Sequence, residues 1–342
     1  MVRILLICIH LFLFCCTEIF AVDFVCSPVQ LECIKTKAFQ EYLDVKVPAV
    51  KISASGGIGR NLHSFSDVAA QRSALLLIFH GILRDDRKTL DNGVKALAMP
   101  FEFQKTDGTF ECPSRGNRQV GPGDIYGESM FVGAVGEAVL ILKNTKYADE
   151  YLPRILKNQN QIKKWLSYFV SIKDQVLAAD LNFGNRLAYD VLALQSFGVI
   201  FNDMVLLDVA EKFILEIVRM QDAKGYYPDN GGPDSSYNAV TAWKMQVCSI
   251  YAPENLKADM MSSIRKSMQW EIAKIDPQTG MVNVDENIRT GKGQEKFLGR
   301  IKDVNYEEVA YSLFYWEPLG ESNSAGDMGR KIISYARAKY GR

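Results

Sequence analysis

Apolar residues recur along most of the chain at the spacing of helices rather than of strands. The clearest example follows Asp203, where apolar side chains fall at i, i+4, i+7, i+8 and i+11 and so share one face of a helix. Asp203 is itself a residue type that favours the position just before a helix. The apolar stripe consists of Leu206, Ala210, Phe213, Ile214 and Ile217.

From residue 65 onward the same pattern predicts one helix after another, and no segment alternates long enough to predict a convincing strand. The chain is therefore predicted to be mainly α. The predicted helices cover residues 68–83, 90–97, 130–142, 152–170, 185–197, 204–217, 237–250, 256–272, 306–316 and 325–340.

Three long loops between these helices share a glycine that is followed closely by apolar or aromatic residues. They open at Gly108, Gly225 and Gly280, and each leads through a polar stretch to a new helix. Helices joined in this way form antiparallel hairpins, and a repeated helix pair is the signature of a stacked or closed helical array. We therefore expect the three glycine loops to lie at the same end of the array.

The loop at residues 222–238 is too rich in glycine and proline for helix and too aromatic for a disordered linker. A long loop inside a compact domain is often functional. Asp234 or Ser235 is a natural cap for the next helix, which places Tyr237 in its first turn at the edge of the loop. Tyr237 is thus a candidate site residue, with a well-packed tyrosine as the simpler alternative.

The N-terminus has the pattern of a secretory signal. Arg3 precedes an apolar run at residues 4–14 that is short for a membrane span, and Ala21 offers a cleavage point. A lipid anchor at Cys16 is the less favoured alternative. We expect a secreted or periplasmic protein with a signal peptide at residues 1–21, a surface-packed extension at residues 22–60 and one helical domain at residues 61–342.

Composition excludes some functions. The 342 residues carry 40 basic and 40 acidic side chains, and this zero net charge argues against a nucleic-acid binder. A metal site is not expected, because there is no C-x-x-C spacing and only His63 and His80 follow the signal. Disulfides are expected in an exported protein, although the pairing stays open. The four cysteines available are Cys26, Cys33, Cys112 and Cys248.

The stretch from Gly225 to Tyr237 resembles loops of (α/α) toroid polysaccharide lyases and related secreted carbohydrate-active proteins. Asn185-Arg186, which opens a helix after a loop, resembles a second element of such proteins. The resemblance covers these two stretches in residues and roughly residues 65–316 in architecture. It implies an (α/α) toroid or incomplete toroid of antiparallel helical hairpins, and an exported lyase that cleaves an acidic, uronate-containing polysaccharide by β-elimination without a cofactor.

The resemblance also implies roles for particular residues. Asn185 and Arg186 would neutralise the sugar carboxylate, Tyr189 would share a helix face with Asn185, and Tyr237 would transfer a proton. Many such lyases add a histidine, which this chain lacks near these elements. The remaining candidates would contact the polysaccharide, and they are Tyr126, Tyr226, Tyr227, Asp234, Trp243, Arg289 and Lys292.

Basic residues cluster in two of the loops. If the loops share one rim, they form a positively charged mouth suited to an acidic polymer. One group comprises Arg289, Lys292, Lys296, Arg300 and Lys302, and the other comprises Lys105, Arg115 and Arg118.

Two other functions remain open from the sequence. A glycoside hydrolase needs two carboxylates that face the scissile bond. A non-catalytic glycan-binding protein would instead use Tyr126, Tyr226, Tyr227 and Trp243 as stacking surfaces. The carboxylates available to a hydrolase are Asp124, Glu128, Asp229, Asp234 and Glu286.

Overall fold

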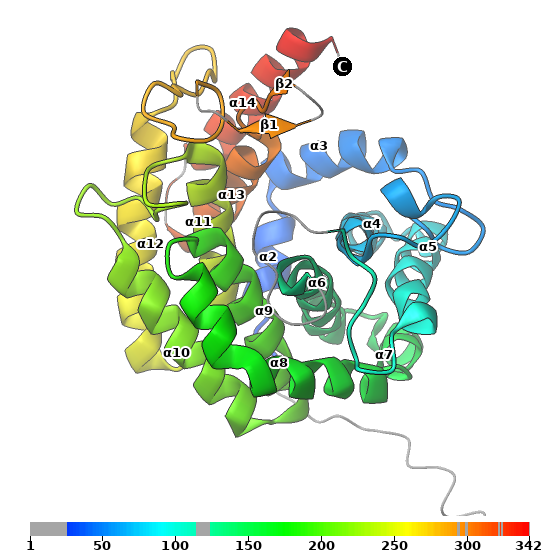
Figure 1. The fold of residues 1–342 in the computed structure, drawn as a ribbon. Coiled ribbons are helices and arrows are strands. Elements are labelled where there is room, and N and C mark those ends of the chain that lie inside the picture. Colours follow the sequence, from blue (N-terminus) through cyan, green and yellow to red (C-terminus); the bar gives the residue numbers. More distant parts are fainter. Residues whose placement is uncertain are drawn as a thin grey trace, which may run out of the picture.

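The computed structural model describes residues 26–113, 124–292, 295–297, 300–320, 322 and 324–341, and these are mainly helical (Figure 1). Within these residues the only paired strands are the short β1 (Lys296–Phe297) and β2 (Arg300–Ile301), which are antiparallel. The prediction of a mainly α protein is confirmed.

Four helices form an inner layer, because their residues leave almost no face to water. In α9 every residue except Val199 and Phe201 is buried. A helix that is buried all round must be enclosed by other elements. The inner helices are α6 (Ile125–Lys143), α9 (Gly184–Phe201), α11 (Ser235–Ser249) and α13 (Tyr306–Leu319).

The inner helices run parallel to their neighbours. Near the start of α6 and α9, Ser129 donates a hydrogen bond to Asp190, and further along the same two helices Gly136 packs against Ser196. Contacts between α9 and α11, and between α11 and α13, follow the same order. The N-terminal ends of all four helices therefore lie at one end of the molecule.

Each inner helix packs against a helix that follows it in the chain, and these helices form an outer layer that also includes α5. On α10 the five apolar residues predicted from the sequence are all buried, and Asp203 caps the helix by accepting from the backbone N–H groups of Val205 and Leu206. The outer helices are α5 (Arg87–Ala98), α7 (Ala148–Leu156), α8 (Gln159–Asp180), α10 (Met204–Met220), α12 (Glu254–Ala273) and α14 (Ala325–Tyr340).

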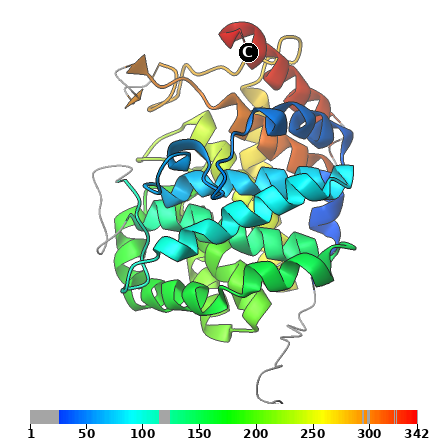
Figure 2. The same ribbon diagram turned by 90° about the vertical axis from the view of Figure 1, so that its right-hand side faces the viewer.

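Three N-terminal helices complete the array, namely α2 (Val29–Ile34), α3 (Lys37–Lys46) and α4 (Ala74–Arg84). α4 pairs with α5, and Figure 2 shows these two helices side by side. α3 contacts both α4 and α14, so it joins the first hairpin to the last (Figure 1). Short 3-10 helices cover Val47–Ala49, Gly59–Asn61, Val68–Ser73 and Met99–Phe103.

The segment at residues 26–60 is part of the core and not the surface extension that was predicted. Ile34, Phe39 and Leu43 have no exposed surface, and they belong to one hydrophobic core that extends to Ile332 in the last helix. The signal peptide predicted at residues 1–21 lies outside the described residues.

One glycine turn occurs four times. In each copy a glycine with a φ between +76° and +104° lies against the backbone of an outer helix at a lysine, so that an added side chain would clash there or force the backbone apart. The second residue after each glycine is buried. The glycine–lysine pairs are Gly56–Lys95, Gly108–Lys164, Gly225–Lys266 and Gly280–Lys331, and the buried residues are Ile58, Phe110, Tyr227 and Val282.

A glutamine clamps three of the four turns. Gln221 Nε2 donates to the carbonyl oxygen of Gly225 and to that of Ser263 on α12, both at 2.7 Å. Gln104 and Gln71 make the equivalent pairs of bonds in the two earlier turns. The turns at Gly108, Gly225 and Gly280 each precede the N-terminal end of an inner helix, which agrees with the expectation that they share one end of the array.

Two details differ from the sequence predictions. The helix predicted at residues 152–170 is two helices, α7 and α8, which are separated by residues 157–158. The four cysteines of the described chain are free thiols, so the expected disulfides are not found. By length and hydropathy α6 would pass for a membrane span, but 94% of its most apolar window is buried inside the protein, as expected of a core helix.

Candidate functional site

The N-terminal ends of the inner helices bring polar and aromatic side chains together. Tyr126, Asn185 and Tyr237 lie in the first turns of α6, α9 and α11. Tyr126 interacts electrostatically with Arg72, Tyr189 and Glu308, and Tyr237 interacts with Tyr126. We call this group the rim cluster, and it consists of Arg72, Tyr126, Asn185, Tyr189, Tyr237 and Glu308.

Asn185 has an unused hydrogen-bonding atom. The side chain is 2% exposed, and its Nδ2 donates to the hydroxyl of Tyr126 at 3.1 Å. Its Oδ1 is buried and has no hydrogen-bond partner among the described residues. Leaving such an oxygen unpaired costs about 1–3 kcal/mol. A bound hydroxyl or amide donor would restore the missing bond.

Arg186 is held away from the role predicted for it. Its Nη1 lies 3.0 Å from Asp180 Oδ1, and its guanidinium lies over the rings of Phe183 and Tyr126, at 4.3 Å and 5.3 Å from the ring centroids. The charge is already neutralised by Asp180. Arg186 is therefore placed to fix the ring of Tyr126 rather than to bind a carboxylate directly.

Tyr189 shares a helix face with Asn185, as predicted, since both contact Tyr126. Its ring meets that of Tyr126 edge-on, with centroids 5.9 Å apart. On its other side Lys244 Nζ lies 5.2 Å from the ring centroid. Burial lowers the pKa of Lys244, whose partner is Glu137 at 3.6 Å. Tyr189 thus lies between Tyr126 and a buried charge pair.

Tyr237 is tied into a charged network. Its hydroxyl donates to Glu295 Oε2 at 2.7 Å and accepts from Lys302 Nζ at 2.5 Å. The guanidinium of Arg289 lies 4.3 Å from the ring centroid. Burial raises the pKa of Tyr237, Arg289 opposes this effect, and Glu295 adds to it. The phenol is therefore protonated at neutral pH.

Sequence reasoning missed Arg72 and Glu308. Arg72 lies in the 3-10 helix that leads into α4, and its Nη1 donates to the carbonyl oxygen of Ala69 at 3.0 Å. Glu308 lies in the first turn of α13; burial raises its pKa and Arg72 lowers it. Both side chains are half-buried. The available signal was that both lie near the start of a helix predicted from the sequence, at residues 68–83 for Arg72 and 306–316 for Glu308.

Four predicted substrate contacts are structural in this arrangement. The ring of Tyr227 is fully buried and its hydroxyl pairs with Ser263, so it offers no stacking face. Asp234 is also fully buried, and it caps α11 as predicted. Tyr226 packs on Trp270, with centroids 5.3 Å apart. Trp243 is covered by Tyr311 at 4.6 Å and by Lys244 Nζ at 3.4 Å from its ring centroid.

The predicted basic mouth is largely neutralised. Arg289 pairs with Asp229 and lies 3.2 Å from Glu295, which also pairs with Lys302. Lys292 pairs with Asp285, and Lys105 pairs with Glu111. Lys296 and Arg300 remain exposed, whereas Arg115 and Arg118 lie outside the described residues.

The carboxylates considered for a hydrolase are mostly engaged elsewhere. Glu128 is fully buried and accepts from Trp165 Nε1 and from the backbone N–H of Phe110; burial raises its pKa to about 7. Asp229 is bound by Arg289 and Glu286 by Lys274. Asp124 is buried as well. In the described part of the chain no group of three metal-ligating side chains is placed to hold an ion.

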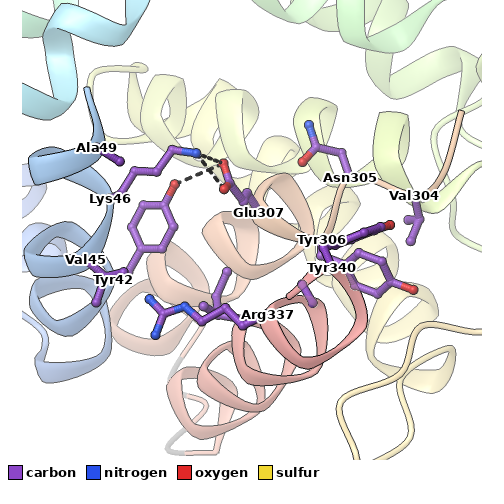
Figure 3. Close-up of a pocket in the computed structure, with 12 residues that line it drawn as sticks. Tyr42, Val45, Lys46, Ala49, Val304, Asn305, Tyr306, Glu307, Arg337 and Tyr340 are labelled. Atoms are coloured by element: carbon purple, nitrogen blue, oxygen red, sulfur yellow. Dashed lines mark hydrogen bonds and ion pairs between the residues drawn. The ribbon is translucent and has the colours of Figure 1, made fainter. Parts of the chain in front are cut away.

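A separate cavity lies beside α3, the start of α13 and α14 (Figure 3). Its volume is about 540 Å³, and none of its lining residues belongs to the rim cluster. Lys46 Nζ binds both carboxylate oxygens of Glu307 there, at 2.6 and 2.7 Å. The sequence analysis did not identify this cavity, because it forms between helices that are far apart in the chain.

No known protein family, curated protein or solved structure matches this chain.

Proposed function

We propose that the helical hairpins form an incomplete (α/α) toroid. The parallel inner helices, the outer helix paired with each of them and the four copies of the glycine turn support this fold. α3 joins the two ends of the array. Such a fold gathers the N-terminal ends of the inner helices at one rim, where several loops supply functional residues.

On this fold we propose an exported enzyme that cleaves an acidic, uronate-containing polysaccharide by β-elimination. The observation that carries the proposal is the rim cluster. Among the described residues it combines an amide oxygen without a hydrogen-bond partner, a half-buried arginine, a carboxylate of raised pKa and the protonated phenols of Tyr126 and Tyr237. The loop and the Asn185-Arg186 pair that resemble those of toroid lyases lie at the same rim.

Asn185 and Arg72 would bind the uronate. The guanidinium of Arg72 would neutralise the sugar carboxylate, which makes the adjacent C5 proton more acidic. Asn185 Oδ1 would accept from a sugar hydroxyl. This assignment transfers to Arg72 the role predicted for Arg186, because Arg186 is already paired with Asp180.

Glu308 would act as the base, and Tyr126 or Tyr237 as the acid. Glu308 takes the proton from C5. The electron pair of the former C5–H bond forms a double bond between C4 and C5, and the bond from C4 to the glycosidic oxygen breaks. The departing oxygen takes the phenolic proton, and proton exchange with solvent then resets both groups. Burial raises the pKa values of Glu308, Tyr126 and Tyr237, which strengthens the carboxylate as a base and keeps the phenols protonated.

A panel of acidic and neutral polysaccharides tests the proposal. The product should show both the ultraviolet absorbance of an unsaturated uronate and new reducing ends, on acidic polymers only. New reducing ends without this absorbance would identify a hydrolase. Binding without either product would identify a glycan-binding protein.

A further inference from the structure

The cavity beside α3 and α14 has the size and lining of a small-molecule site. Binding pockets commonly have volumes of about 300–1,000 Å³ and mostly apolar walls with a few charged groups, and this cavity measures about 540 Å³. Tyrosines stand on two sides of it, with Tyr42 opposite Tyr306 and Tyr340 (Figure 3). The aliphatic part of the wall consists of Val45, Ala49, Val304, Ile333 and Ala336.

Among the described residues, one cation that lines the cavity has no counterion. Lys46 and Glu307 neutralise each other, and Tyr42 adds a hydrogen bond to Glu307 at 3.4 Å. Arg337 also lines the cavity, and its half-buried guanidinium makes no ion pair with any described residue. Figure 3 shows its side chain extending along the cavity floor toward Tyr42. The lining therefore has a net charge of one positive unit.

We propose that this cavity binds a small molecule with an apolar ring and a single carboxylate. The ring would lie between Tyr42 and the pair formed by Tyr306 and Tyr340, because aromatic faces favour offset or edge-to-face contact with a ring. The carboxylate would pair with Arg337, whose planar guanidinium matches both carboxylate oxygens. The inference does not depend on the proposed lyase activity.

Such a ligand would also bridge the two ends of the helical array. Tyr42 and Lys46 belong to α3, near the start of the chain, and Arg337 and Tyr340 belong to α14, at its end. A ligand that binds only the folded protein raises its thermal stability by mass action. The midpoint of thermal unfolding should therefore rise with ligand concentration.

Phenylacetate is a suitable probe, with phenethylamine and benzyl alcohol as cationic and neutral controls. A fragment of this size is expected to bind in the millimolar range. Ligand-observed NMR on the full chain should show binding of phenylacetate at least tenfold tighter than of either control. Equal binding of the three probes, or no binding of phenylacetate, would overturn the proposal.

Two variants locate the site. Arg337→Gln removes the charge and should weaken phenylacetate binding at least tenfold, whereas Arg219→Gln, on an exposed part of α10, should leave it unchanged. Ala336→Phe fills the cavity without changing its charge and should also abolish binding. Circular dichroism confirms folding of each variant. Unchanged binding in either folded cavity variant would show that the probe binds elsewhere.

Discussion

Two phenols of the rim cluster, those of Tyr126 and Tyr237, differ in how their hydroxyl groups are held. Tyr126 accepts a hydrogen bond from Asn185, whereas Tyr237 is fixed between Glu295 and Lys302. In the proposed mechanism, Lys302 would relay the proton that solvent returns to Tyr237 after each turnover, since it already donates to that oxygen. Tyr237 is therefore the better placed of the two to donate repeatedly to a departing oxygen.

The first prediction concerns the hydroxyl of Tyr237. Tyr237→Phe keeps the ring under Arg289 and leaves Glu295 paired with Lys302, so the fold should survive. Turnover should fall by roughly 10²–10⁴-fold with binding largely retained, as expected for loss of a proton donor. Steady-state kinetics on a uronate polymer measures this. Tyr168→Phe is the matched control, because the hydroxyl of Tyr168 has no partner among the described residues; full activity in Tyr237→Phe would exclude the role.

The second prediction concerns the buried carboxyl of Glu128. Burial raises its pKa from 4.5 to about 7. Between pH 4.5 and about pH 7 the folded state binds more protons than the unfolded state. The contribution of Glu128 to stability is therefore fully present below about pH 4.5 and is lost as the pH rises through about 7. At about 1.4 kcal/mol for each pKa unit, a shift from 4.5 to about 7 corresponds to a loss of at most about 3–4 kcal/mol.

Glu128→Gln removes this titration and keeps an oxygen that can accept from Trp165. The difference in unfolding free energy between the variant and the wild type should therefore move in favour of the variant from about pH 5 to about pH 8. Urea unfolding at several pH values measures it, with Glu102→Gln, at an exposed position, as the control. Parallel pH profiles for Glu128→Gln and the wild type would contradict the assigned pKa shift.

At the scale of helices and loops, apolar helix faces and helix caps could be predicted from the sequence. The stripe on α10 and the caps Asp203 and Asp234 follow from residue types at fixed spacings, and the structure confirms them. The break between α7 and α8 was missed because apolar periodicity continues on both sides of residues 157–158. The first copy of the glycine turn, at Gly56, was not predicted, because its residues were assigned to a surface-packed extension.

Partners that are distant in the chain could not be read in the same way. Nothing in the sequence places Arg72 beside Glu308, since their proximity depends on how the first and last hairpins meet. Tyr227 shows the reverse error: its loop composition indicated a surface residue, but the repeated turn directs the second residue after each glycine into the core.

The third prediction tests the glycine turn. Gly225 and Gly231 both have positive φ, at +104° and +85°, so alanine strains the backbone at either position, by about 1–2 kcal/mol. A Cβ at Gly225 would lie 2.7 Å from the carbonyl oxygen of Lys266, whereas one at Gly231 meets nothing within 4 Å. Gly225→Ala should therefore lower the free energy of unfolding clearly more than Gly231→Ala. Equal losses in urea unfolding would show that Gly225 is needed for its φ alone.

At the scale of the whole molecule, a buried polar network joins helices from the beginning, middle and end of the chain. Glu137 on α6 pairs with Lys244 on α11, and its Oε1 accepts from Gln30 on α2 at 2.9 Å and from Tyr315 on α13 at 3.3 Å. These groups fix how the inner helices meet α2, which the hydrophobic contacts alone do not specify.

The fourth prediction concerns this network. Glu137→Leu leaves Lys244 buried without a counterion and should cost about 3–5 kcal/mol of unfolding free energy. Adding Lys244→Met should recover most of that loss, because the second charge is then also removed. Chemical denaturation of both variants measures the effect. If the double variant is as unstable as the single one, the loss of unfolding free energy comes from altered packing around Glu137 and not from the broken charge pair.

The central claim is that the rim cluster acts on a sugar carboxylate. Its most direct test compares one uronate polymer with the same polymer after its carboxyl groups have been reduced to alcohols, since without the carboxyl group the C5 proton is no longer acidic and β-elimination cannot proceed. We predict unsaturated product from the uronate polymer, none from the reduced polymer, and loss of product from the uronate polymer in Arg72→Met. Cleavage of the reduced polymer at a similar rate would contradict the account.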